Sequence, residues 1–289
     1  MINRDRVTPL TILAVLGIFF LCMIASYIVT YSILGRPNSD GQYEYYPMVI
    51  SQIIASIFSF GVPTIIVSAW KSRAPFDTLT DGKRVSPIAW ILAIACITVC
   101  QPLVEWSTFV NEQLCMRMES WESMRAFSKL NNELYCSIMQ HDTLVECCIM
   151  FLTMAILPAI VEEMFFRGTM QQILTATTRN PWVAIFTTAS VFSLLHGDIV
   201  AFFPRMILGY ILGVIYYFGK NIWVNIAAHA FNNSLAVILV LTSDGDILET
   251  LNKLQDNPGP VMPIIALALT ILGIQGYIYR TRENRVETN

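Results

Sequence analysis

Two adjacent carboxylates, Glu162 and Glu163, and the guanidinium of Arg167 lie inside an otherwise apolar stretch of this 289-residue chain. An ionisable side chain at membrane depth costs roughly 2.5–3.5 kcal/mol on insertion scales and usually serves a function. On a helix, Glu163 and Arg167 are four residues apart and share a face, whereas Glu162 is turned about 100° away. We therefore expect Arg167 to neutralise Glu163, and Glu162 to stay available for chemistry. The alternative is an ion cluster that only ties helices together.

Two of the three histidines also lie in apolar runs, each with a partner four residues away. Phe192 and His196 share a helix face, as do His229 and Asn233. His196 ends its run, and His229 lies roughly 10 Å along its own by the helical rise, so the two meet only if helices are tilted or short. Together with Glu162 they supply a general base, a second proton-handling group and donors for a developing oxyanion. Hydrolysis of a peptide bond by an activated water needs these groups.

The composition identifies the solvent in which these groups must work. The chain is 55% hydrophobic and 13% charged, with a mean hydropathy of +0.55, whereas a soluble domain carries about 25% charged residues. The apolar runs are about 20 residues long and do not alternate with period two, so they predict membrane-spanning helices and not a barrel. The predicted fold is an all-α, polytopic transmembrane bundle, and no basic stripe suggests a nucleic-acid partner.

We expect a single integral membrane domain over residues 1–289 with about eight spans. Most of the 18 Lys and Arg residues fall on the side of the two termini, so the positive-inside rule predicts that both termini are cytoplasmic. The long polar segment Asn111–Asp142 is typical of an amphipathic helix or helical hairpin on the outer interface, and Pro158 predicts a kink beside Glu162. The expected spans are roughly Pro9–Leu34, Pro47–Trp70, Pro87–Val110, Leu144–Thr177, Pro181–Leu195, Phe203–Phe218, Ile222–Thr242 and Val261–Tyr279.

The order Glu-Glu-x-x-x-Arg, Phe-x-x-x-His and His-x-x-x-Asn on successive polar-bearing spans resembles the CPBP family of intramembrane glutamic proteases. That family includes the CAAX prenyl endopeptidases and bacterial proteins called Abi. The resemblance covers about residues 144–242, the expected catalytic core. It implies that Glu162 and His196 activate a water molecule and that His229 and Asn233 form an oxyanion hole. The supporting positions of the family are matched by Glu163, Arg167 and Phe192.

The motifs and the resemblance together predict an intramembrane endopeptidase. Its expected substrate is a membrane-embedded or lipid-modified, CAAX-like peptide or protein, admitted through a cavity open to the cytoplasm and to lipid. The compact chain with a cytoplasmic N-terminus resembles the bacterial branch of the family, which implies a multi-pass protein of the bacterial plasma membrane. The expected partners are this substrate and the bilayer.

Three other functions compete with this prediction. No cofactor is required by the main prediction, but a zinc-dependent protease would use Glu162, His196 and His229 as metal ligands. The chain has no His-Glu-x-x-His and no C-x-x-C among its seven cysteines, and Asn233 is a poor zinc ligand. A catalytically idle scaffold or chaperone of the same fold would use the polar residues only for assembly. A transporter or proton relay would also use intramembrane Glu and His, but no inverted repeat appears.

Overall fold

The computed structural model describes residues 9–35, 43–71, 85–138, 143–242 and 259–287, nearly all of them helical. No strand occurs in these ranges, which confirms the predicted all-α fold. Seven helices in the described ranges are long and apolar enough to cross a membrane, and the remaining expected span, Pro181–Leu195, is a shorter apolar helix. The chain is therefore an integral, multi-pass membrane protein.

The helical elements follow one another with short connections, and three of the spans contain a turn or a π-helical segment. In chain order they are α1 (Pro9–Leu34), α2 (Tyr45–Ser56), η2 (Ile57–Gly61), α3 (Val62–Lys71), α5 (Pro87–Val99), α6 (Gln101–Cys115), α7 (Trp121–Ile138), α8 (Leu144–Met150), η3 (Phe151–Ile156), α9 (Leu157–Phe165), η4 (Phe166–Met170), α10 (Gln171–Thr178), α11 (Pro181–Leu195), η5 (Ile199–Ala201), α12 (Phe202–Gly219), α13 (Ile222–Thr242) and α15 (Val261–Glu287).

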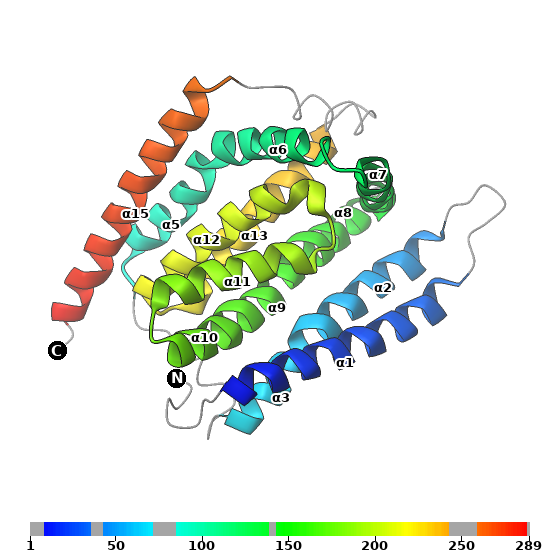
Figure 1. Ribbon diagram of the computed structural model, residues 1–289, viewed down its shortest axis with the longest axis horizontal. Helices are drawn as coiled ribbons and strands as arrows, with labels where there is room; N and C mark the ends of the chain where they lie inside the picture. The colour runs from blue at the N-terminus through cyan, green and yellow to red at the C-terminus, as the bar shows by residue number, and fades with distance from the viewer. Residues whose placement is uncertain (1–8, 36–42, 72–84, 139–142, 243–258, 288–289) are drawn as a thin grey trace.

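The bundle has a central group of helices with one pair on each side. On one side α1 packs against α2, η2 and α3, and on the other α15 packs against α5 and α6. The helices from α8 to α13 lie between these pairs (Figure 1). All the sequence motifs belong to this central group, so the outer pairs shield the charged residues from lipid.

The longest span, from α8 to α10, is not a regular α-helix. Two π-helical segments, η3 and η4, flank α9, which carries both glutamates. Pro158 lies in the first turn of α9 and has no N–H to donate, and the helix widens just before it, where the N–H of Leu157 bonds to the carbonyl of Leu152. The irregularity expected at Pro158 thus takes the form of a π-helical segment, which often occurs at functional sites.

Helices α11 and α12 approach closely because α12 carries Gly209 and Gly213, a Gly-x-x-x-Gly spacing. A Cβ built on Gly213 would lie 2.9 Å from Cγ2 of Ile185, and one built on Gly209 would lie 3.2 Å from Cδ1 of Phe192. Small residues at this spacing let membrane helices pack backbone against backbone. The close approach brings α12 beside the Phe192–His196 motif.

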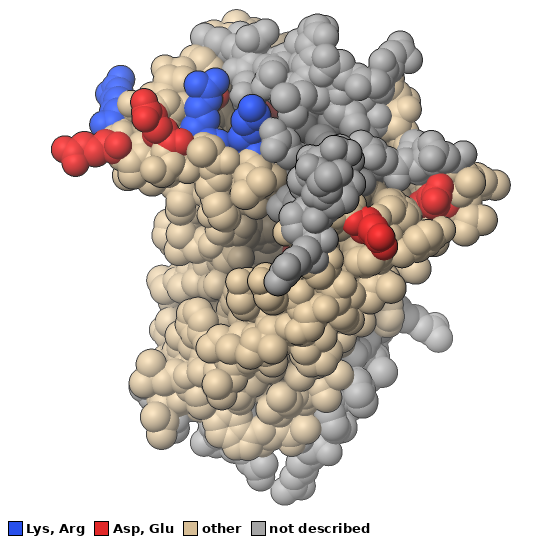
Figure 2. Space-filling view, turned by 90° about the vertical axis from the view of Figure 1, so that its right-hand side faces the viewer, with Lys and Arg blue, Asp and Glu red and all other residues tan. Residues whose placement is uncertain are grey.

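Helix α7 lies crosswise at one end of the bundle. The start of α1 and the end of α15 lie at the opposite end (Figure 1). Figure 2 looks at the α7 end and shows charged side chains gathered over the α6–α7 turn and α7. Exposed members of this group are Arg117, Glu119, Glu122, Arg125 and Lys129. The helix predicted within Asn111–Asp142 is therefore confirmed, and residues 139–142 lie outside the described ranges.

Candidate active site

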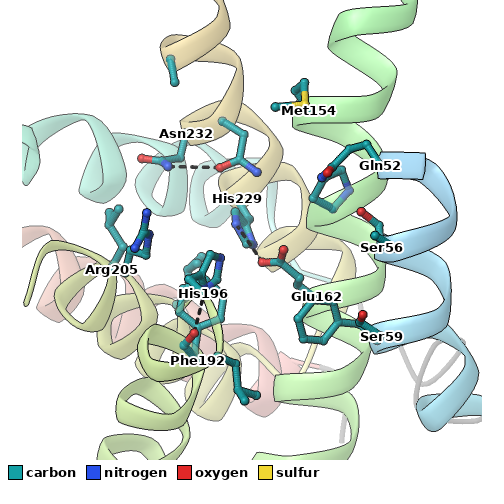
Figure 3. Close-up of a pocket in the computed structure, with 18 of the residues that line it drawn as sticks. Gln52, Ser56, Ser59, Met154, Glu162, Phe192, His196, Arg205, His229 and Asn232 are labelled. Atoms are coloured by element: carbon teal, nitrogen blue, oxygen red, sulfur yellow. Dashed lines mark hydrogen bonds and ion pairs between the residues drawn. The ribbon is translucent and has the colours of Figure 1, made fainter. Parts of the chain in front are cut away.

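The four residues expected to act on the substrate line one cavity of about 460 Å³. Glu162 comes from α9, His196 from the end of α11, and His229 and Asn233 from α13. The volume falls in the range of about 300–1,000 Å³ that is usual for ligand pockets. Figure 3 shows Glu162 directed toward His229 and His196 from the facing helices.

The two neighbouring glutamates point in different directions, as the helical spacing predicted. Glu162 lines the cavity, where its Oε2 lies 3.8 Å from Nε2 of His229. Glu163 is fully buried and does not line the cavity. Its Oε1 accepts a hydrogen bond of 2.7 Å from Nη1 of Arg167, so the expected pairing of Glu163 with Arg167 is present.

Glu163 also has a contact that its spacing from Arg167 did not predict. Its Oε1 lies 2.9 Å from Nδ1 of His229, and its Oε2 accepts a hydrogen bond of 3.2 Å from Nδ2 of Asn225. Because a carboxylate can only accept, Nδ1 of His229 carries the proton in this contact. Glu163 therefore holds the ring of His229 with its Nε2 side toward Glu162.

Arg167 connects the glutamate helix to two others. Its Nη2 donates 2.8 Å to the carbonyl of Gly209 on α12, and its guanidinium lies 5.3 Å from the ring centroid of Phe192 on α11. Arg167, like Glu163, is fully buried. A buried charge that lost its partner would be strongly destabilising, so this ion pair and its hydrogen bonds are part of the fold as well as of the site.

His196 caps the C-terminal end of α11 and reaches the cavity because that helix has only 15 residues. A short fifth span was one of the two conditions under which His196 and His229 could meet. Nδ1 of His196 bonds to the carbonyl of Phe192 at 2.7 Å. A carbonyl accepts, so Nδ1 donates, and in the neutral ring Nε2 is left as an acceptor. Phe192 also packs edge-on against His196, with ring centroids 4.7 Å apart.

The loop after His196 is held by two neighbouring helices. Asn111 of α6 donates 2.8 Å to the carbonyls of both Ile199 and Val200, and its Oδ1 accepts 3.1 Å from the N–H of Phe203. Ser128 of α7 donates 3.2 Å to Oδ2 of Asp198. Helix α7 is thus tied to the segment that positions His196.

Several polar residues of the cavity were not among the predicted site residues. They are Gln52, Ser56, Ser59, Arg205 and Asn232. The first three recur at i, i+4 and i+7 on one face of α2 and η2, a spacing that can be read from the sequence. Arg205 lies in the first turn of α12, inside the expected span Phe203–Phe218. Asn232 donates 3.4 Å to Oδ1 of Asn233 and accepts 3.1 Å from Gln101.

The three residues named for the alternative zinc site all line the cavity. Within the described ranges, no group of three or more His, Cys, Asp and Glu residues is disposed to hold a metal ion. Nδ1 of His229 is engaged by Glu163 and Nδ1 of His196 by the carbonyl of Phe192, so each ring presents Nε2 to the cavity. Metal-ligating histidines usually have such a partner on the other ring nitrogen, so these contacts suit a metal ligand as well as a proton-handling group.

The sequence was compared with known families, curated proteins and solved structures. Residues 144–235 match the family model described as Rce1-like, the type II CAAX prenyl endopeptidases. Neither a curated protein nor a solved structure matches the chain. The matched segment begins at the start of α8 and ends just after Asn233, so it contains all three motifs. The resemblance predicted from the motifs is confirmed: over residues 144–235 the chain is similar to the Rce1-like type II CAAX prenyl endopeptidases.

Proposed function

We propose that this protein is an intramembrane endopeptidase that hydrolyses a peptide bond of a membrane-embedded or lipid-modified substrate. The family match supports a membrane protease. The single observation that carries the proposal is the convergence of Glu162, His196, His229 and Asn233, from three helices, on one cavity. An ion cluster that served only for assembly would not need a carboxylate facing open space beside two histidines.

In the proposed reaction, Glu162 takes a proton from a water molecule as the water oxygen attacks the carbonyl carbon of the scissile bond. His196 contributes its Nε2, the nitrogen not engaged by Phe192, as a hydrogen-bond acceptor for the same water. The carbonyl oxygen becomes an oxyanion. The proton then passes to the amide nitrogen, the C–N bond breaks, and a carboxylic acid and an amine leave. General acid–base catalysis of this kind contributes about 10²–10⁴-fold.

The oxyanion is stabilised by Nδ2 of Asn233 and by Nε2 of His229. Since Nδ1 of His229 already donates to Glu163, its Nε2 can donate only if the ring is doubly protonated. Glu163, at 2.9 Å, is the anion that compensates such a cation, because Glu162 has by then taken up the proton of the water. Donors preorganised at the position of developing charge are usually the largest single contribution to catalysis.

The proposed substrate is a protein or peptide with a lipid-modified, CAAX-like C-terminus, and the proposed location is the bacterial plasma membrane. The matched family acts on prenylated CAAX ends, as its description says. The cavity is lined by apolar side chains as well as by the reactive groups, among them Phe60, Met154, Leu195 and Leu208. No cofactor is part of the proposed mechanism.

The test is proteolysis in liposomes with a library of lipid-modified and unmodified membrane peptides, with and without a chelator. We expect cleavage by the wild type, a loss of about 10²-fold or more in Glu162→Gln, and no effect of the chelator. The matched control is Glu105→Gln, which alters a half-buried glutamate of α6 outside the cavity. Cleavage that depends on added zinc would favour the metalloprotease. Failure to cleave any peptide, with Glu162→Gln unchanged in stability, would favour the idle scaffold.

A further inference from the structure

The cavity contains a permanent positive charge that the proposed reaction does not use. Among the described residues that line it, Arg205 is the one Lys or Arg, and its side chain is 26% exposed. Figure 3 shows Arg205 on the side of the cavity away from Glu162, with His196 and His229 between them. A cation in the first turn of a helix is also disfavoured by the helix dipole, so its position in α12 does not serve the stability of that helix.

The donors of Arg205 are only partly used. Nη1 donates 3.3 Å to the backbone carbonyl of Asp198, and Nη2 lies 3.6 Å from Oδ2 of the same residue, beyond good hydrogen-bonding distance. The carboxylate of Asp198 also accepts hydrogen bonds from two other groups. Its Oδ1 accepts from the N–H of Val200 at 3.1 Å, and its Oδ2 accepts from Ser128 at 3.2 Å. A guanidinium has five N–H donors, so within the described structure Arg205 keeps donors free for a ligand.

The surroundings of Arg205 indicate the kind of anion. Its neighbours on α12, Leu208 and Leu212, line the same cavity and are apolar, and no second Lys or Arg accompanies it among the described lining residues. One guanidinium with apolar neighbours suits one planar monoanion, which it can bind through two parallel hydrogen bonds. A carboxylate fits this description, whereas a phosphate dianion would call for more positive charge.

We propose that Arg205 binds the free C-terminal carboxylate of the substrate, while the scissile bond lies beside Glu162. This inference rests on the proposed function and deepens it. Anchoring the chain end at a fixed place in the cavity sets how many residues separate that end from the bond that is cleaved. The enzyme then removes a C-terminal fragment of defined length, and it discriminates against peptides whose C-terminus is blocked.

The experiment compares two peptides that differ only at the last group. Both carry an S-farnesyl cysteine followed by three apolar residues, and one ends in a free carboxylate, the other in a carboxamide. Peptide binding is measured by fluorescence anisotropy in detergent, with the Glu162→Gln protein, so that no peptide is cleaved during the measurement. Peptide cleavage is measured with protein that keeps Glu162. Each measurement is repeated with Arg205→Gln, Arg205→Lys and the control Arg117→Gln, which removes an exposed arginine near the same end of the bundle and outside the cavity.

We expect the free acid to bind about tenfold to a hundredfold more tightly than the amide. Arg205→Gln should abolish this preference, Arg205→Lys should retain part of it, and Arg117→Gln should retain all of it. If Arg205 only clamps the Asp198 loop, Arg205→Gln will weaken both peptides equally and leave their ratio unchanged, which overturns the proposal. Equal binding of acid and amide by the protein with Arg205 intact, or no binding of either, also overturns it.

A third peptide, amidated and with aspartate as its last residue, separates the chain end from an acidic side chain. If it binds as tightly as the free acid, the terminal carboxylate is not what Arg205 selects. The inference and the proposed function fail in different ways. Cleavage that ignores the terminal group refutes the role of Arg205 and keeps the endopeptidase. Acid-selective binding without any cleavage keeps the role of Arg205 and refutes the endopeptidase.

Discussion

At the residue scale, Glu162 and Glu163 have the same side chain and opposite environments. Glu163 has hydrogen-bond partners on Arg167, Asn225 and His229 and no exposed surface. Among the described residues, Glu162 has one ionisable partner within 4 Å, His229 at 3.8 Å, and it faces the cavity. The difference arises from their adjacent positions on α9, which direct them to different helix faces. One glutamate is therefore committed to structure and to orienting His229, and the other is free to meet a substrate.

The first prediction concerns how substitutions of Glu162 and Glu163 change the stability of the protein. Glu163→Gln should lower the free energy of unfolding by about 3–5 kcal/mol, because it leaves Arg167 as a buried charge without its partner. Glu162→Gln should change it by much less, since Glu162 has no partner within hydrogen-bonding distance among the described residues. Thermal unfolding in detergent measures both. Equal destabilisation by the two substitutions would show that Glu162 belongs to the same structural network.

A double-mutant cycle extends this test to the ion pair. Arg167→Met alone should be as destabilising as Glu163→Gln alone. The double variant should lose less stability than the sum of the two, because it leaves neither charge unpaired. Strictly additive losses would mean that the 2.7 Å contact between Arg167 and Glu163 contributes little to stability. A loss of turnover in Arg167→Met with unchanged stability would contradict the supporting role assigned to Arg167.

Asn111 is predicted to be a positioning residue. Asn111→Ala removes the side chain that holds the loop from Ile199 to Phe203, so His196 should lose its fixed place. A shift of about 1 Å can cost a factor of about 10². We expect kcat to fall by about that factor while KM changes little, and the exposed neighbour control, Gln113→Ala, to behave as wild type. A fall in thermal stability without the kcat effect would assign Asn111 to the fold alone.

At the element scale, the irregular segments are placed around the site. The π-helical segments η3 and η4 flank α9, and η2 interrupts the span that contributes Ser56 and Ser59. Each π-helical segment inserts a residue and changes which face the following residues occupy. Periodicity read from the sequence assumes 3.6 residues per turn throughout, so it gave the spans and not these segments. The motifs were still found, because the paired residues of each are only four positions apart.

Close packing of α11 and α12 leads to the third prediction. Gly213→Ala should lower stability by about 1–3 kcal/mol, the usual cost of overpacking, because its Cβ would lie 2.9 Å from Ile185 and 3.2 Å from Oε1 of Gln171. Gly17→Ala on α1 is the matched control. Nothing lies within 4 Å of its added Cβ, so the higher helix propensity of alanine should leave stability unchanged or raised. Equal melting temperatures for the two variants would show that α12 can shift to accommodate the methyl group.

At the scale of the whole molecule, the sequence predicted the helical membrane fold, and the four residues expected to act on the substrate line one cavity. These follow from local quantities, namely apolar length and residue spacing. Two of the residues that were missed, Arg205 and Asn232, join the site only because helices distant in the sequence pack side by side. Arg205 lies at the start of α12, next to the end of α11, and no local pattern says that these ends adjoin Glu162. Spacing alone also could not show that Glu163 contacts His229, 66 positions away.

The positions of the cavity and of the termini in the bundle connect two predictions about which side of the membrane each one faces. The cavity extends toward the α7 end, since Arg205 lies at the start of α12, Gln52 in the first third of the span that α2, η2 and α3 form, and Val237 in the last part of α13. The termini meet the opposite end (Figure 1). Cytoplasmic termini and a cavity open to the cytoplasm were both expected. If the cavity opens at the α7 end, these two predictions place its mouth on opposite sides of the membrane.

The fourth prediction decides between them. Single-cysteine variants, one at the C-terminus and one at Ser123, exposed on α7, are labelled from the outer side of intact cells with an impermeant reagent. Positive charge near the termini predicts labelling at position 123 alone, with the cavity then reached from outside. Labelling of the C-terminal cysteine alone would reverse the orientation and place the mouth of the cavity at the cytoplasm. Labelling at both positions would contradict the arrangement of α7 and the termini at opposite ends.

The division of labour between the two glutamates has a consequence for how this chain can evolve. The contacts of Glu163 reach α13 directly, and those of its partner Arg167 reach α11 and α12. Glu162 contributes a single longer contact to this network. A descendant that replaced Glu162 would lose the proposed chemistry and keep its architecture. Substitution of Glu163 would endanger both at once. A change of a single codon, that of Glu162, could thus give a descendant without activity but with an intact bundle. Such a descendant would be recognised by a retained Glu163–Arg167 pair beside a different residue at position 162.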